Sequence, residues 1–168
     1  YTILKLDGEL SRIGYVKPAG ENFFEKVSSA THEITGIFGN PTQYTAIYAE
    51  APNIMFKTGF SSAQTLAIIL RFNGAFLFTL HSYFSILPIE AMAVSMRKQV
   101  IGVGRFKVNP KEEVLKWVTS QIPNYSDWPI IDKGKNKGKL RTECFDMADS
   151  YIVARYGMIH ESRTYQNQ

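Results

Sequence analysis

The chain opens with Tyr1-Thr-Ile-Leu-Lys-Leu-Asp7, an apolar run that ends in a carboxylate and is followed by Gly8. A short apolar run bounded by an Asp-Gly turn signal predicts a buried β-strand. A second run of this kind, Tyr44-Thr-Ala-Ile-Tyr-Ala49, ends in Glu50. Two core strands that each end in an acid would aim both carboxylates at a common point.

Two more acids, Asp146 and Asp149, lie in Glu143-Cys-Phe-Asp-Met-Ala-Asp-Ser-Tyr-Ile-Val-Ala154, which has a helical pattern. Their spacing places both carboxylates on one helix face. Together with Asp7 and Glu50 they would repel one another unless a cation neutralised them. Such ligands suit Mg²⁺, with Mn²⁺ as the alternative, and two ions about 4 Å apart catalyse in-line phosphodiester hydrolysis. The alternative for each acid is an ordinary strand-end or helix-surface residue, because the chain carries 15 acidic residues.

Hydrophobic periodicity and turn signals predict the other elements. Strands are expected at 1–7, 12–18, 22–30, 44–50 and 86–91, with a helix or an irregular link over 31–42. Helices are expected at 62–80, 111–120 and 142–158, with a loop from Pro123 to Gly138. This order predicts an α/β fold in which helices flank a mixed five-stranded sheet. A length of 168 residues predicts a single domain, 1–168.

Composition indicates a globular protein of a reducing compartment. The chain is 45% hydrophobic and 13% aromatic, which is typical of an ordered domain. The single cysteine, Cys144, excludes an internal disulfide, and we interpret it as a small core residue rather than a nucleophile. The histidines have no metal-ligand spacing, and no secretory signal is present at the start. We therefore expect a cytoplasmic protein.

Basic residues are concentrated in one part of the chain. The segment from Arg97 to Arg141 carries eleven Lys and Arg against four Asp and Glu, whereas the rest carries eight against eleven. A metal-dependent nuclease divides its charge in this way, with acids for metal ions and basic residues for phosphates. The alternative is a solvated basic face.

The stretch from Ser62 to Phe84 is apolar enough to raise the question of a membrane span. It contains Arg71 near its centre, where a charged side chain is costly in lipid, so we expect no contact with a membrane. The helix expected at 62–80 is apolar on almost every face and must be covered on both sides. The cover is either a second subunit or the interior of one large core.

Five segments follow one another over nearly the whole chain: Ile3-Leu-Lys-Leu-Asp-Gly-Glu-Leu-Ser-Arg-Ile-Gly-Tyr-Val16, Ala49-Glu50, Met96-Arg-Lys-Gln-Val-Ile-Gly-Val-Gly-Arg105, Lys111-Glu-Glu-Val114 and Asp146-Met-Ala-Asp-Ser-Tyr-Ile-Val-Ala154. In this order they resemble the motifs of RuvC-type Holliday-junction resolvases. The turn reads Gly8-Glu9 where that family usually has Pro-Gly, and extra residues separate Arg105 from Lys111. These departures resemble the phage-encoded branch. The resemblance implies a single RuvC-like nuclease domain with a ribonuclease H-like sheet.

The resemblance further implies an endonuclease that resolves four-way (Holliday) DNA junctions by paired nicks and leaves 5′-phosphates. Asp7 would bridge the two metal ions, and Glu50, Asp146 and Asp149 would complete their ligand sets. Phe56 either stacks on a base near the junction centre, worth ~1–3 kcal/mol, or fills the local core. Phosphate contacts are expected from Arg12, Lys57, Arg97, Lys98, Arg105, Lys107 and Lys111.

A homodimer is also implied, with the helix at 62–80 at its interface. The expected interface residues are Leu66, Ile69, Leu70, Phe72, Asn73 and Phe76. The loop Lys133-Gly-Lys-Asn-Lys-Gly-Lys139 alternates lysine with glycine, so we expect no fixed recognition surface there. The loop is either a mobile clamp on a DNA arm or a solvated segment.

Two other functions remain open. The first is a non-catalytic DNA-binding or assembly protein of the same fold, against which the intact set of four acids argues. The second is a nuclease of relaxed specificity that acts on flaps, forks or RNA–DNA hybrids. The basic Gly-x-Gly segment at 102–104 and the loop around Phe56 favour branched DNA.

Overall fold

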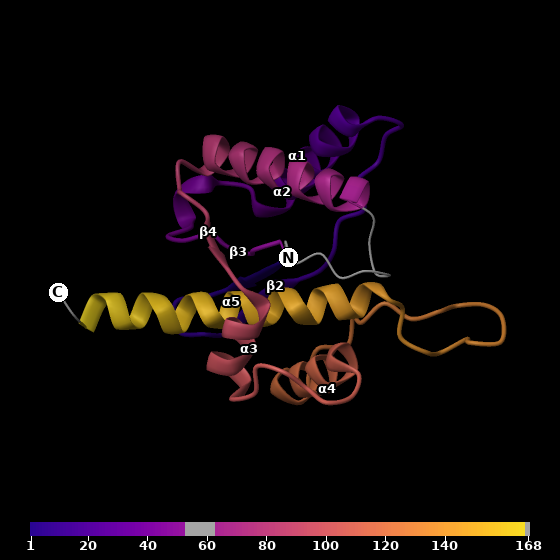
Figure 1. Ribbon diagram of the computed structural model, residues 1–168. Coiled ribbons are helices and arrows are strands. Elements are labelled where there is room, and N and C mark those ends of the chain that lie inside the picture. The colour runs from indigo at the N-terminus through magenta and orange to yellow at the C-terminus, as the bar shows by residue number, and fades with distance from the viewer. Residues whose placement is uncertain (53–62, 167–168) are drawn as a thin grey trace. The chain divides into compact units, whose positions relative to one another are not determined.

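The computed structural model describes residues 1–52 and 63–166, with side chains up to Arg163 (Figure 1). Within these residues the fold is mixed α/β, with five α-helices and two sheets of two strands each. The contacts group the chain into two compact units. Unit 1 contains Tyr1–Tyr15 and the chain from Ala93 onward, and unit 2 contains Val16–Met92.

Unit 1 begins with a short antiparallel pair, β1 (Thr2–Leu4) and β2 (Leu10–Ile13). The connecting turn is closed by two backbone hydrogen bonds, from the Gly8 amide to the Lys5 carbonyl and from the Lys5 amide to the Glu9 carbonyl, each 2.9 Å. Gly8 has φ +91°, a conformation that glycine adopts without steric cost. The remaining elements of the unit are helices: α3 (Ala93–Ile101), α4 (Pro110–Gln121) and α5 (Glu143–Gln166).

The core of unit 1 lies along one stripe of α5. Its buried side chains repeat at helical spacing, as an amphipathic helix requires: Cys144, Met147, Ala148, Tyr151 and Ile152. Helices α3 and α4 both pack against α5 and lie on the same side of it in Figure 1. They contribute buried Met96 from α3 and buried Val114, Leu115 and Val118 from α4. This packing fixes which face of α5 is left for other contacts.

Unit 2 contains two long helices and a parallel strand pair. Helix α1 (Phe23–Phe38), the 3₁₀ turn η1 (Pro41–Gln43) and α2 (Ala63–Phe84) accompany β3 (Tyr48–Glu50) and β4 (Ile89–Ala91), with Tyr48 opposite Ile89. The core joins buried Ala30 and Ile34 of α1 to buried Leu80 and Phe84 of α2. Phe38, Tyr44 and Phe84 add a cluster of edge-to-face ring contacts, with centroids 5.4–5.7 Å apart.

The strand expected at 22–30 was wrong, because these residues form the first half of α1. The Asn22 side chain accepts a hydrogen bond from the Glu25 amide at 3.0 Å, and Glu25 accepts one from the Glu21 amide at 2.8 Å. Reciprocal capping of this kind starts a helix. The buried positions Ala30 and Ile34 then continue with helical periodicity.

The first strand was expected to be buried up to Asp7, and this was also wrong in part. Strand β1 ends at Leu4, and the Leu6 side chain is 86% exposed within the turn. Strand β2 ends at Ile13 rather than at residue 18. The helices expected at 62–80, 111–120 and 142–158 correspond to α2, α4 and α5, and strands expected at 44–50 and 86–91 contain β3 and β4.

Candidate active site

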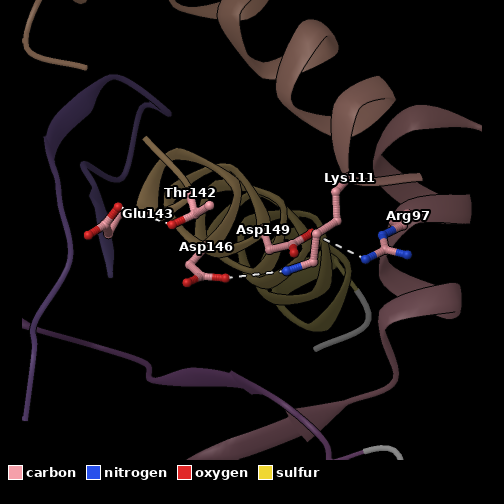
Figure 2. A network of polar contacts seen from close by, with 6 residues as sticks. All are labelled: Arg97, Lys111, Thr142, Glu143, Asp146 and Asp149. Carbon is pink, nitrogen blue, oxygen red and sulfur yellow. Dashed lines mark hydrogen bonds and ion pairs between the residues drawn. The ribbon is translucent and has the colours of Figure 1, made fainter. Parts of the chain in front are cut away.

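The acid pair on α5 is the centre of the candidate site. Asp146 and Asp149 flank the buried residues Met147 and Ala148, so the two acids lie at the edge of the surface on which α3 and α4 pack. Figure 2 shows Asp146 beside Lys111 and Asp149 beside Arg97, with Thr142 and Glu143 at the start of the helix. The spacing therefore gives the shared helix face that the sequence predicted.

Asp149 forms an ion pair with Arg97 of α3. The guanidinium Nη2 donates to Asp149 Oδ1 at 3.2 Å, and the two side chains are only 17% and 19% exposed (Figure 2). A pair this poorly solvated is screened less by salt than a surface pair. Removing one partner would leave the other charge partly buried and uncompensated, which is destabilising. Arg97 was expected to contact phosphate, and here it neutralises a predicted metal ligand.

Asp146 forms a weaker pair with Lys111, in the first turn of α4. The Lys111 Nζ and Asp146 Oδ1 atoms are 3.6 Å apart, and the side chains are 58% and 73% exposed. Exposed pairs of this kind are worth ~0.2–1 kcal/mol and weaken with salt. Two cations from the predicted phosphate-binding set thus contact the two acids of α5, one tightly and one loosely.

Asp7 lies in the exposed turn after β1, where its Oδ1 atom accepts a hydrogen bond from the Glu9 amide at 2.8 Å. The turn is held against α5 by Arg155, whose Nη1 atom donates to the Gly8 carbonyl at 3.4 Å. Thr2 and Ser150 hydroxyls, 2.7 Å apart, hold β1 to the same helix. Arg155 is six residues beyond Asp149, which is about 9 Å along an α-helix. The turn is therefore anchored further along α5 than the acid pair.

Glu50 is the last residue of β3 and is exposed at the end of that strand, as the sequence predicted. It belongs to unit 2, whereas Asp7, Asp146 and Asp149 belong to unit 1. In the described part of the chain, no three His, Cys, Asp or Glu side chains form a group that could hold a metal ion. Carboxylate oxygens are nevertheless the donors that Mg²⁺ prefers, so the chemistry of the α5 pair fits that ion.

Most of the other predicted phosphate contacts are exposed basic residues of unit 1. Lys98 lies in the last turn of α3, Arg12 lies on β2, and Arg105 and Lys107 follow α3. Phe56 and Lys57 lie outside the described residues. The predictions for these side chains stay predictions.

The basic Gly-x-Gly segment has a structural explanation that periodicity could not supply. Gly102 ends α3 with φ +87°, and its amide donates to the Lys98 carbonyl at 3.1 Å. A Cβ atom on Gly104 would lie 3.0 Å from the Val94 carbonyl oxygen. The chain passes so close to α3 that only glycine fits at position 104 without a shift.

Cys144 is fully buried in α5, and its Sγ atom donates to the Pro129 carbonyl at 3.3 Å. Burial raises the pKa of the thiol, which keeps it protonated and unreactive near neutral pH. The prediction that Cys144 is a buried core residue is therefore confirmed.

The residues predicted for a dimer interface have mixed environments on α2. Ile69 and Leu70 are exposed, whereas Phe72 stacks on Phe76 and meets the Phe23 ring edge-on at 6.4 Å. Asn73 donates to Glu90 of β4 at 2.8 Å, and Leu66 is half-buried. By length and composition alone, α2 is also apolar enough to cross a membrane.

Comparison of the chain with protein-family models, with curated proteins and with solved structures gave no match. Function is therefore inferred from the residues and their geometry. The ion pairs of α5 were missed in the sequence because their partners are distant, as with Arg97 and Asp149, which are 52 residues apart. The only signal was the concentration of basic residues after position 96.

Proposed function

We propose that this protein is a metal-dependent, structure-selective endonuclease that resolves four-way DNA junctions by paired nicks with 5′-phosphates. The observation that supports the proposal most is the α5 face, where Asp146 and Asp149 each contact a cation from one of two basic segments. Acidic metal ligands bordered by phosphate-binding cations are what phosphodiester hydrolysis on DNA requires.

In the proposed site, Asp146 and Asp149 hold Mg²⁺, or Mn²⁺, together with Asp7 and Glu50. Metal ions held by these carboxylates would supply Lewis-acid activation of a water molecule and of the departing 3′ oxygen. The four carboxylates concentrate negative charge, which would repel the DNA backbone if it stayed uncompensated. Compensation by metal ions and by the bordering cations removes that repulsion.

Arg97 and Lys111 have two successive partners in this proposal. Each contacts a carboxylate of α5 in the structure. If metal ions neutralised these carboxylates, Arg97 and Lys111 would become available to bind the phosphates of the substrate. Lys111 is exposed and weakly paired, so it exchanges partners at little cost, whereas Arg97 gives up a partly buried contact.

The proposal includes a ribonuclease H-like arrangement of a mixed sheet with flanking helices, without the strand expected at 22–30, which forms part of α1. The chain supplies one antiparallel pair, β1 with β2, and one parallel pair, β3 with β4. A mixed sheet combines these two kinds of pairing. The proposal also places the protein in the cytoplasm, which is the host cytoplasm for a phage-encoded enzyme.

A homodimer is part of the same proposal. The exposed apolar side chains of α2 include Ile68, Ile69, Leu70 and Phe78, the last 71% exposed. Apolar surface of this kind marks an interaction site more often than bare solvent contact. A two-fold dimer would cover it and would bring two active sites to one junction, which suits paired incision.

The alternative function is a DNA-binding protein without catalysis. The Arg97–Asp149 contact favours it, because a carboxylate already paired with a guanidinium needs no metal ion for charge balance. The two functions differ in one outcome, since only the nuclease breaks phosphodiester bonds when Mg²⁺ is added.

The test is incubation of the protein with a synthetic four-way junction, a linear duplex and an RNA–DNA hybrid, with Mg²⁺ or EDTA. The nuclease proposal predicts incision of the junction alone, and only with Mg²⁺. Binding without incision supports the non-catalytic alternative. Equal cleavage of all three substrates contradicts junction selectivity and supports a nuclease of relaxed specificity.

A further inference from the structure

The lysine-rich segment before α5 folds back on itself as a hairpin, defined here as residues 129–141 and called the basic hairpin. Ile130 and Leu140 form a β-bridge, and the Ile131 amide donates to the Lys139 carbonyl at 2.8 Å. The Arg141 amide donates to the Pro129 carbonyl at 2.9 Å. Figure 1 shows the hairpin as an orange finger that stands away from the helices of unit 1.

The tip of the basic hairpin is shaped by its glycines. Gly134 and Gly138 have φ +80° and +84°, and both turn residues have open space around them. The Lys137 amide donates to the Gly134 carbonyl and the Lys139 amide to the Asn136 carbonyl, each at 3.1 Å. Glycine supplies the positive φ angles that these turns need, whereas the expectation that the lysines form no fixed recognition surface stays a prediction.

The lysine side chains of the tip form almost no contacts with other polar side chains in the described part of the chain. Lys133, Lys135 and Lys137 are exposed and form no ion pair or side-chain hydrogen bond with the described residues. Lys139 donates only to the Asn136 side chain, at 3.1 Å. These charges contrast with Arg97 and Lys111, which already have carboxylate partners.

The base of the basic hairpin is fixed to the helix that carries the candidate acids. The Pro129 carbonyl accepts hydrogen bonds both from Arg141 across the hairpin and from buried Cys144 in α5. Arg141 also forms an ion pair with Glu143 at 3.1 Å. The base of the hairpin is therefore fixed immediately before the first turn of α5, which contains Asp146.

We infer that the basic hairpin is a second DNA-binding element, which grips the phosphates of a duplex arm beside the proposed cleavage site. The inference rests on the proposed function for the identity of the ligand. Four residue steps from Pro129 to Lys133 span about 13 Å at most. At 3.4 Å per base pair, the hairpin reaches phosphates about four base pairs along the arm.

The position of the apolar residues favours DNA over a lipid surface. A membrane-binding hairpin carries its apolar side chains at the tip, where they enter the acyl region. Here the exposed apolar residues, Ile130 and Leu140, lie at the base, and every residue from Asp132 to Lys139 is charged, glycine or asparagine. The tip thus offers cations without an apolar anchor, which suits phosphates at the surface of a duplex.

The experiment measures binding of the full chain to a labelled linear duplex in EDTA, at several salt concentrations. The test variant is Lys135→Gln/Lys137→Gln, and the matched control is Lys26→Gln/Lys116→Gln, which removes two exposed lysines elsewhere. Each lost phosphate contact flattens the plot of log affinity against log salt by about 0.9. We expect the test variant to lose a slope of about two and at least roughly tenfold in affinity at low salt, with the control close to wild type.

A second variant separates shape from charge. Gly134→Val/Gly138→Val keeps every lysine but forces β-branched residues into positive φ, so the folded tip is lost. We expect an affinity loss of about threefold or more with the charge unchanged. Wild-type affinity in this variant would overturn the claim that the fold of the tip positions the lysines.

Other outcomes overturn the inference as a whole. Equal losses in the test and control variants would mean that net charge alone matters. Unchanged DNA binding together with lost binding to phosphatidylserine vesicles would assign the hairpin to lipid. The binding assay requires neither a metal ion nor cleavage. Unchanged binding by the lysine variant would therefore not contradict junction cleavage, and absence of cleavage with Mg²⁺ would not contradict DNA binding by the hairpin.

Discussion

The two longest helices of the protein, α5 in unit 1 and α2 in unit 2, differ in what they leave exposed. Helix α5 buries an apolar stripe and carries beside it one exposed acid, Asp146, and one partly buried acid, Asp149, each paired with a cation from a neighbouring helix. Helix α2 buries Leu80 and Phe84 but exposes Ile68, Ile69 and Phe78. The charged side chains of α5 can interact with water and ions, whereas the exposed apolar side chains of α2 would be stabilised by contact with an apolar partner.

This difference suits α5 to the chemistry of the proposed nuclease and α2 to its assembly. Charged side chains on α5 are the groups that can hold ions and phosphates, while the exposed side chains of α2 can gain only from burial. In the proposed nuclease, α5 carries catalysis and α2 joins two copies. Variants of the two helices should therefore fail in different assays.

The largest effect is expected from the acids of α5. Asp149→Asn or Asp146→Asn should lower the rate of junction cleavage by more than the roughly 10–100-fold that the loss of an outer-shell group costs, because each variant removes a metal ligand. Junction binding should persist, since repulsion of the phosphates falls. Gel-based cleavage and binding assays measure both quantities. Asp127→Asn, at an exposed acid outside both α5 and the hairpin of residues 129–141, is the matched control, and cleavage at the wild-type rate by Asp149→Asn would exclude Asp149 as a metal ligand.

The next effect is on stability and contrasts the two helices directly. Met147→Ala opens a cavity in the buried stripe of α5 and should lower the free energy of unfolding by ~2–4 kcal/mol. Ile69→Ala on the exposed face of α2 should change the free energy of unfolding of the dissociated monomer by less than ~0.5 kcal/mol, so the two variants are compared at protein concentrations below dimerisation. Urea denaturation checks both values. Equal losses would show that the exposed face of α2 is in fact packed.

Assembly is expected to respond to α2 alone. Ile69→Asp places a charge in the proposed dimer interface and should shift sedimentation at micromolar concentration from dimer to monomer, with loss of paired but not of single incision. Gln64→Asp, an exposed polar position of the same helix, is the control. A wild-type monomer in the presence of DNA would contradict the dimer, and wild-type binding to neutral vesicles would assign α2 to a membrane.

The smallest effect concerns the ion pairs Arg97–Asp149 and Lys111–Asp146. A double-mutant cycle with Arg97→Gln and Asp149→Asn should give a coupling energy of about 1 kcal/mol or more, since both side chains are poorly solvated. The cycle with Lys111→Gln and Asp146→Asn should give ~0.5 kcal/mol or less, because that pair is exposed. Unfolding at low and high salt measures both. Equal coupling energies would show that the Arg97–Asp149 pair is no stronger than the Lys111–Asp146 pair.

The sequence predicted what local periodicity controls. Helix α5 follows from the spacing of Met147, Ala148, Tyr151 and Ile152, and the shared face of Asp146 and Asp149 follows from the same spacing. The strand expected at 22–30 failed because Phe23, Phe24 and Val27 favour strands, while the capping signal of Asn22 and Glu25 favoured a helix and prevailed.

Contacts between residues that are distant in the chain could not be predicted from the sequence. Nothing local indicates that Arg97 meets Asp149 or that Arg155 holds the turn at Gly8, since these contacts depend on how helices and strands pack. The shape of the basic hairpin was missed for a different reason. The alternation of lysine with glycine was considered only as a bar to a fixed recognition surface, and the turns for which Gly134 and Gly138 supply the φ angles were not predicted.

The most direct test of the proposed nuclease maps the incisions on a four-way junction labelled on each strand in turn. With Mg²⁺, we expect nicks at symmetrical positions in two opposite strands and 5′-phosphate ends that ligase can reseal, and in EDTA we expect no incision. A junction that stays intact with both Mg²⁺ and Mn²⁺, at protein concentrations that saturate binding, would contradict it.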